Sequence, residues 1–116
     1  MKTNYFEMIG KVNYIDTKVL DSGMYLTKIL LGLYLGKDKQ GNTNYESVNI
    51  TFFGEQAEQF CEVVTKGDFV NVTGRVNINK YTNKDKKEVK DIQFIGGEFV
   101  KVEYDKASKE FVSAPW

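Results

Sequence analysis

Five large residues lie on the strand faces that should point to water: the aromatic residues Tyr45, Phe53, Phe69 and Tyr81, and the cation Arg75. Around each of them apolar residues recur at every second position, which predicts a buried face on the opposite side of the strand. An aromatic ring that a protein keeps in water can stack on a flat molecule, and a neighbouring arginine attracts negative charge. The spacing therefore predicts a surface that binds something flat and anionic.

Charge is distributed unevenly along the chain, although 16 basic and 16 acidic residues give a net charge of zero. Residues 71–90 carry six basic side chains against two carboxylates, whereas residues 55–70 carry four carboxylates against one lysine. A zero net charge argues against a nucleic-acid partner, but a polyanion would still be attracted to the basic segment and repelled by the acidic one. An ordinary solvated lysine hairpin is the alternative interpretation.

The elements that must position these residues follow from the hydrophobic periodicity. Alternation predicts strands within residues 5–16, 24–36, 45–53, 69–81 and 89–102. Ala57, Phe60, Cys61 and Val64 make one apolar helical stripe, and Gly67 is a suitable helix stop. Five short curved strands with a helix after the third predict an all-β fold, namely a five-stranded Greek-key barrel of the OB type.

Alternation also predicts which side chains of the last two long strands point into the core. These are Val70, Val72, Val76 and Ile78 in the fourth strand, and Ile92 and Phe94 in the fifth. The remaining face of the fourth strand carries Phe69, Arg75 and Tyr81.

At 116 residues the chain is expected to form one domain, a barrel at residues 1–104 followed by a short, flexible tail at residues 105–116. A single cysteine, the lack of a visible secretory signal and the lack of a membrane-spanning run favour the cytoplasm. There is no histidine, Cys61 has no obvious activating base, and no spacing suggests a metal or cofactor site. The residues therefore predict a protein that is not an enzyme and that needs no cofactor.

Five short motifs, in order, resemble the bacterial-type single-stranded DNA-binding proteins. They are residues 9–12, residues 21–23, residues 48–58, residues 66–67 with 72–76, and Tyr81 at the start of a polar hairpin. The resemblance covers roughly residues 5–102 and implies an OB-fold whose sheet surface wraps single-stranded DNA during replication, recombination or repair. It also implies a homotetramer built from dimers that pair through their first strands, with interface hydrophobes at Met8, Leu30 and Phe69.

The resemblance places two of the family's stacking positions on Phe53 and Tyr81. A third stacking position falls on Ser47, so Tyr45, two residues earlier on the same face, is expected to take its place. Tyr34 would stack as well, and Asn77 and Asn79 would form hydrogen bonds with bases or backbone. Phosphate contacts are expected from Lys28, Arg75, Lys80, Lys84, Lys86 and Lys87.

Several of these residues have a structural alternative. Tyr34 would also suit a barrel edge or a subunit interface, Tyr45 a cap on the sheet, and Tyr81 a hairpin anchor. Arg75 would also suit an ion pair within the sheet. Phe53 would be core if the strand register slipped by one residue. Phe69 is expected to pack against the helix or a partner subunit, and Cys61 to lie in the core.

The chain also departs from the resemblance at its C-terminal end. Family members usually carry a long tail with an acidic tip that recruits replication and repair proteins, whereas this sequence ends about a dozen residues after the barrel, at Trp116. Recruitment through such a tail is therefore in doubt, and the short form fits a version encoded by a phage or mobile element acting in a bacterial host cell. The alternative functions are an OB-fold module for protein–protein assembly and an OB module that prefers RNA or double-stranded DNA.

Overall fold

The computed structural model describes residues 3–114 and contains six strands and one helix. In chain order they are β1 (Tyr5–Val19), β2 (Tyr25–Lys37), β3 (Thr43–Phe53), α1 (Gly54–Val63), β4 (Phe69–Thr82), β5 (Glu88–Asp105) and β6 (Glu110–Ser113). The first five strands and the helix coincide with the predicted elements to within a few residues at each end. The strand β6 was not predicted.

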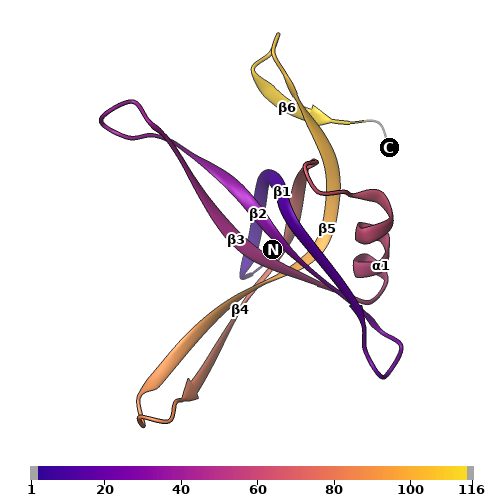
Figure 1. The fold of residues 1–116 in the computed structure, drawn as a ribbon, viewed down its shortest axis with the longest axis vertical. Coiled ribbons are helices and arrows are strands. Elements are labelled where there is room, and N and C mark those ends of the chain that lie inside the picture. Colours follow the sequence, from indigo (N-terminus) through magenta and orange to yellow (C-terminus); the bar gives the residue numbers. More distant parts are fainter. Residues whose placement is uncertain (1–2, 115–116) are drawn as a thin grey trace.

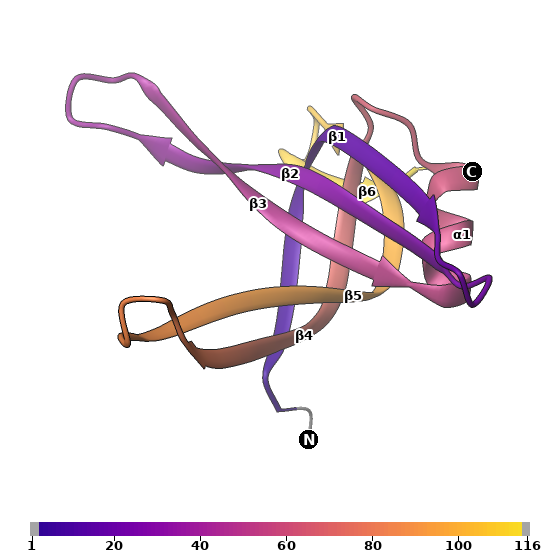
Figure 2. The ribbon, with the colours of Figure 1, turned by 60° about the horizontal axis from the view of Figure 1, so that its bottom comes forward.

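The strands form one sheet in the order β3-β2-β1-β4-β5-β6, which curls until β3 meets β5. This junction is parallel and short, pairing Ile50 with Phe94 and Thr51 with Ile95. It closes β1 to β5 into a barrel, while β6 pairs only with the outer end of β5 (Figures 1 and 2). The predicted OB-type barrel with one helix after the third strand is therefore confirmed.

The helix α1 packs across one end of the barrel and completes the core. The ring of Phe60 stacks on Phe52 with 4.6 Å between centroids and meets Phe99 edge-on at 4.8 Å. The fully buried hydroxyl of Thr27 donates a hydrogen bond to the carbonyl oxygen of Ala57 at 3.0 Å. The helix ends before the predicted stop at Gly67, because the backbone at residue 64 is already extended. Its apolar stripe is thus held by both packing and a buried hydrogen bond.

Close packing around Phe52 leaves no room for a side chain at Gly96. A Cβ atom built on Gly96 would collide with the Phe52 ring, whereas one built on the neighbouring Gly97 would meet its nearest atom at 3.6 Å, an ordinary contact. Gly96 therefore serves a close approach between β5 and the core, and Gly97 does not.

Two hairpins, β2–β3 and β4–β5, project beyond the barrel as arms on the side opposite α1 (Figures 1 and 2). The prediction that Ile78 and Ile92 lie in the core is wrong, since they are 55% and 58% exposed. They form a cross-strand pair within the β4–β5 arm. This part of the hairpin lies beyond the barrel, so no other element within residues 3–114 covers the face that carries them. Val70 and Val72, lower on the same strand, are fully buried as predicted.

The segment expected to be a flexible tail carries the strand β6, which pairs with β5 from Val102 opposite Ser113 to Asp105 opposite Glu110. The carboxylate of Asp105 holds the connecting turn, accepting hydrogen bonds from the Ala107 amide at 3.1 Å and the Ser108 hydroxyl at 2.9 Å. A four-residue strand gives little periodic signal, which is why the sequence did not predict it. The division into a domain at 1–104 and a tail at 105–116 stays a prediction, and Trp116 lies outside the described residues.

Candidate nucleic-acid interface

The outer face of β2 and β3 is a strip of paired side chains that runs from the base of their arm to the helix end of the barrel. Residues opposite each other on neighbouring strands share a face of the sheet. From the arm inward, the pairs on the outer face are Tyr34 with Tyr45, Gly32 with Ser47, Leu30 with Asn49, Lys28 with Thr51, and Leu26 with Phe53. Three predicted stacking residues and one predicted phosphate contact therefore lie on a single strip.

Tyr34 and Tyr45 meet at the outer end of this strip. Their ring centroids are 5.7 Å apart at an interplanar angle of 61°, and both side chains are more than half exposed. The contact orders the two rings without covering them, so their faces remain available for stacking. Ser47 lies one pair further in, opposite Gly32, so the expected substitute Tyr45 sits beside the vacant stacking position.

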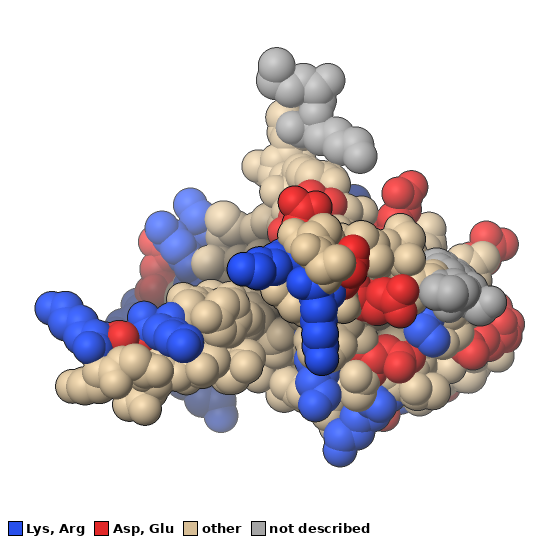
Figure 3. Space-filling view, turned by 90° about the horizontal axis from the view of Figure 1, so that it is seen from above, with Lys and Arg blue, Asp and Glu red and all other residues tan. Residues whose placement is uncertain are grey.

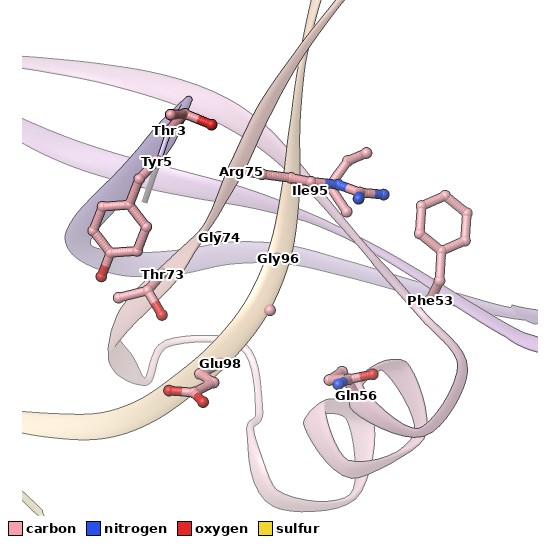
Figure 4. A pocket seen from close by; sticks show the side chains of 11 residues that line it. Thr3, Tyr5, Phe53, Gln56, Thr73, Gly74, Arg75, Ile95, Gly96 and Glu98 are labelled. Carbon is pink, nitrogen blue, oxygen red and sulfur yellow. The ribbon is translucent and has the colours of Figure 1, made fainter. Parts of the chain in front are cut away.

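At the inner end of the strip, Phe53 shares a hollow of about 560 Å³ with Arg75 of β4. Thr51 pairs with Ile95, and Ile95 pairs with Arg75, so the strip continues across β5 onto β4. Figure 4 shows the guanidinium of Arg75 directed toward the side on which the Phe53 ring lies. Among residues 3–114 neither ion pair involves Arg75, since they join Lys18 to Asp16 and Lys101 to Asp68. The alternative of an ion-paired Arg75 thus finds no support there.

The register also settles the position of Phe53. Phe52 is fully buried and Phe53 is 40% exposed, so the register slip that would bury Phe53 does not occur. Phe53 is the residue just before α1, where the chain turns from strand to helix at Gly54 with φ of 66°.

The β4–β5 arm carries the rest of the predicted residues, but on two faces. Arg75, Asn77, Asn79 and Tyr81 alternate along the outer face of β4, and the Asn77 amide donates a hydrogen bond to Asn79 at 3.4 Å. Lys80 lies on the opposite face, paired with Lys90 beside the exposed isoleucine pair. Lys80 and Tyr81 therefore lie on opposite faces of the arm, because successive strand residues point to opposite faces.

Three predicted lysines, Lys84, Lys86 and Lys87, occupy the tip of this arm, and all are exposed. The side chain of Asn83 shapes the tip, since its carbonyl oxygen accepts hydrogen bonds from the amides of Asp85 at 2.9 Å and Lys87 at 3.0 Å. The lysines therefore project from an ordered turn.

The charge of the folded chain is asymmetric. Figure 3 shows lysine and arginine side chains gathered on the side where the arms project and carboxylates on the side of α1. Lys28 is the least favourable of the predicted cations, because Asp16 of β1 lies directly opposite it in the sheet. A polyanion approaching from the arm side would thus meet mostly positive charge.

Sequence reasoning missed four exposed aromatic residues, of which Tyr14 lies beside the strip, opposite Leu30. Tyr5 lines the hollow of Phe53 and Arg75, and Tyr104 and Phe111 flank a second concavity beside Tyr34 and Tyr45. Phe69 also lines this second concavity. Its ring centroid lies 5.9 Å from that of Phe111, whereas the sequence predicted that it packs against the helix or a partner subunit. The alternation of residues 100–104 could have pointed to Tyr104, but nothing in the sequence predicted the pairing of β6 that brings Phe111 to it.

A profile of the single-strand binding protein family matches residues 3–101, which is nearly the whole barrel. The chain belongs to the single-strand binding protein family. The resemblance read from the five short motifs is thereby confirmed.

Two curated relatives support this membership. Proteins named single-stranded DNA-binding protein from Xanthomonas campestris pv. campestris and Xanthomonas axonopodis pv. citri are each 32% identical over an aligned length of 101 residues, and each alignment covers 78% of this chain. The aligned part covers 59% of the first protein and 56% of the second, so this chain spans little more than half the length of the relatives it matches.

Solved structures of the single-stranded DNA binding protein from Thermus aquaticus share the fold. The wild-type protein superposes with a TM-score of 0.67 at 20% identity, and a deletion mutant with a TM-score of 0.68 at 19% identity. Each likeness covers 86% of this chain and 50% of the Thermus chain.

Within residues 3–114, no helix has the length and apolar character needed to cross a membrane. The same residues contain no group of three or more histidine, cysteine or acidic side chains placed to hold a metal ion. Cys61 is partly buried, and its thiol donates to the carbonyl oxygen of Glu58 at 3.1 Å.

Proposed function

We propose that this chain binds single-stranded DNA, as the names of its relatives state for them, and that it does so without strong sequence preference. Single strands expose base faces that a duplex hides, and an aromatic side chain stacks on any base for about 1–3 kcal/mol. Lysine and arginine neutralise phosphates and release counterions, so the binding weakens as salt increases. Stacking would come from Tyr34, Tyr45, Phe53 and Tyr81.

The observation that carries this proposal is the continuity of the exposed strip. It leads from Tyr34 and Tyr45 past Lys28 to Phe53, crosses the barrel seam to Arg75, and continues along the β4 arm to Tyr81. A flexible strand of nucleotides can follow such a path, whereas a rigid duplex cannot bend around it. The alternative of a protein–protein assembly module gives no reason for exposed rings beside lysines.

The test is a titration of the purified chain with fluorescently labelled oligo-dT of graded lengths, followed by anisotropy at several salt concentrations. We expect binding that tightens with length up to a plateau and weakens with salt. Absence of binding at low salt would rule out the proposal, and tighter binding to oligo-U or to duplex of equal length would favour the RNA or duplex alternative.

A paired variant tests the path itself. Phe53→Ala with Tyr81→Ala should weaken oligo-dT binding at least tenfold without unfolding the protein, because both rings are exposed. Val19→Ala is the control, since Val19 is 60% exposed and follows Lys18 in β1, so that it points to the face of the sheet opposite the strip. Equal affinity of the paired variant and the control would place the binding face elsewhere.

We further propose that the chain self-associates, as a tetramer built from dimers. The exposed apolar side chains of Ile9 and Val100 on the outer face of β1 and β5 support an interface on that sheet. Of the predicted interface hydrophobes, Met8 and Leu30 are already partly buried within the chain. Sedimentation equilibrium giving a monomer mass at micromolar concentration would contradict this assembly.

The cellular setting is proposed on the same basis. A sequence-independent binder of single strands would protect DNA during replication, recombination or repair in the cytoplasm of a bacterium, including a host cell if a phage encodes the chain. Recruitment of replication or recombination proteins is tested by pull-down with the intact chain.

A further inference from the structure

A second concavity, of about 840 Å³, lies between the base of the β2–β3 arm and the β5–β6 hairpin. Tyr34 and Tyr45 line it from the arm, and Phe69, Tyr104 and Phe111 line it from the other side. We call it the hairpin groove. It is larger than the hollow of Phe53 and Arg75, and β6, the strand that the sequence did not predict, contributes to one of its walls.

Both walls of the hairpin groove are aromatic and internally braced. On the hairpin side, the Phe111 ring lies 5.4 Å from Tyr104 and 5.9 Å from Phe69 between centroids. On the arm side, the Tyr34 and Tyr45 rings touch each other. Tyr104 is 52% exposed and Phe111 is 40% exposed, so the braced rings still present open faces. Rings held in this way lose little conformational freedom when a ligand stacks on them.

Small residues make the space between the two walls. Gly32 pairs with Ser47, and both line the groove together with Gly10. An aromatic residue at position 47, as the family resemblance leads one to expect, would project into this space. Its replacement by serine leaves a gap with rings on either side, which is a suitable shape for a flat group.

The charge of the lining favours an anionic ligand. Lys11 is the one charged residue that lines the groove, and the polar side chains of Asn13 and Ser47 accompany it. Five carboxylates adjoin lining residues in sequence, and none of them lines the groove itself: Glu46, Asp68, Glu103, Asp105 and Glu110. Asp105 is engaged in the turn between β5 and β6, and Asp68 is engaged by Thr65 and Lys101. Glu46 pairs with Leu33 on the opposite face of the β2–β3 arm, Glu103 pairs with Val112, and Glu110 pairs with Asp105. A nucleotide unit combines a flat base with a phosphate and therefore matches this set of groups.

We infer that the hairpin groove is a further binding site for single-stranded DNA, in which Tyr104 and Phe111 of the β5–β6 hairpin replace the stacking residue that is absent at Ser47. This inference rests on the proposed function and adds a second wall to the path, beyond the strip on β2 and β3. The DNA would leave Tyr34 and Tyr45 toward β6, and the bound length per chain would increase accordingly.

The direct test is photo-cross-linking of the intact wild-type chain to oligo-dT carrying 5-iododeoxyuridine, with the modified residues identified by mass spectrometry. We expect cross-links on Tyr104 or Phe111 in addition to residues of the strip. Cross-links confined to the strip and the β4–β5 arm would overturn the inference while leaving the proposed function intact. A wild-type chain that fails to bind oligo-dT at all would overturn both.

Variants give an independent measurement. Tyr104→Ala with Phe111→Ala should weaken binding to long oligo-dT about tenfold, corresponding to one lost stacked base, and should shorten the length at which affinity reaches its plateau. Phe111→Tyr, which keeps a ring, and the control Val19→Ala should leave both quantities unchanged. If the double variant lowers the sedimenting mass and keeps its affinity and plateau length, the groove is an interface between copies of the chain and the inference is wrong.

Discussion

The two halves of β4 obey the same alternation and end in opposite environments. Near the helix, Val70 and Val72 are fully buried, whereas further along the same face Ile78 is more than half exposed. The difference is position relative to the barrel, because the first half has β1 and the core against it and the second half belongs to an arm. Alternation therefore predicts which side chains share a face, and closure of the barrel decides which of those faces is buried.

This contrast suggests that the barrel determines stability and the arms determine binding, which experiments can test. Substitutions in the barrel should change stability, and substitutions on the arms should change binding while the free energy of unfolding stays constant. The arms carry Tyr34, Tyr45 and Tyr81 together with the lysine tip, and none of these is buried.

The largest effect is expected from Tyr34→Ala combined with Tyr45→Ala on the β2–β3 arm. Loss of two braced rings should weaken the binding free energy for oligo-dT by about 2–6 kcal/mol, since each stacked base contributes about 1–3 kcal/mol. Anisotropy titration measures the affinity, and urea denaturation should give an unchanged unfolding midpoint. A lowered midpoint would mean that the arm contributes to the fold after all.

In the barrel, Gly96→Ala should destabilise the protein by about 1–3 kcal/mol, because the new Cβ meets the buried Phe52 ring. Gly97→Ala is the adjacent control, and its ordinary contacts predict a much smaller loss. Urea denaturation of both variants measures the difference. Similar losses for the two would show that backbone freedom, rather than the collision, explains the need for glycine.

The tip of the β4–β5 arm should act through charge. Lys84→Ala combined with Lys87→Ala is expected to reduce the slope of log affinity against log salt by about 1.4, at roughly 0.7 per lost phosphate contact. Lys80→Ala combined with Lys90→Ala removes the same charge from the opposite face and should reduce the slope less. A larger reduction from the second pair would place the DNA on the inward face of the arm.

Asp68 joins the loop between α1 and β4 to β5, and it makes the stability of the protein depend on pH. Its carboxylate accepts a hydrogen bond from the Thr65 amide at 2.9 Å and lies 3.3 Å from the Lys101 ammonium group, and these two partners lower the pKa of Asp68 despite partial burial. A lowered pKa means that the carboxylate stabilises the folded state above the ordinary pKa of about 3.9. That contribution is lost as the pH falls through the lower folded-state value.

Asp68→Asn should therefore cost about 1 kcal/mol at pH 7, as expected for one lost charged hydrogen bond and a partly exposed ion pair. The difference in unfolding free energy between the variant and the wild type should become smaller near pH 3. Thermal unfolding at both pH values measures this difference. A difference that stays constant with pH would mean that the loss of stability does not come from the charge of Asp68.

The smallest effect is expected from Ile78→Thr combined with Ile92→Thr, which should change the unfolding free energy by less than about 0.5 kcal/mol because both side chains are exposed. Val70→Thr on the same strand is the matched change in the barrel and should cost more than 1 kcal/mol, since it buries a hydroxyl group. Equal costs would contradict the contrast between barrel and arm.

Most of the fold could be predicted from the sequence, because five long segments alternate and one short segment has a helical stripe. What failed were properties that depend on distant parts of the chain. Ile78 and Ile92 have the pattern of core residues, and only the length of the arm explains their exposure. The strand β6 is short, and it is held by Tyr104, Asp105 and Phe111 rather than by its own periodicity.

The candidate site was predicted in part for the same reason. The positions of Tyr45, Phe53, Arg75 and Tyr81 on outer faces follow from period two, and the structure places them there. Period two also predicts that Lys80 and Tyr81 point to opposite faces of the strand, but the number of lysines in a segment does not show on which face each one lies. The hairpin groove required knowledge of how β5 and β6 pair, which no local pattern supplies.

The short seam between β3 and β5 has a consequence for how a ligand and the fold depend on each other. Phe53 and Arg75 face one hollow only when the parallel pairs at Ile50 and Thr51 are made. An oligonucleotide that contacts both residues would therefore stabilise the pairing of β3 with β5. These two strands should separate less often in the DNA-bound protein than in the free protein. Hydrogen exchange at the amide of Ile50, whose side chain is fully buried, would then report DNA binding at a residue outside the strip.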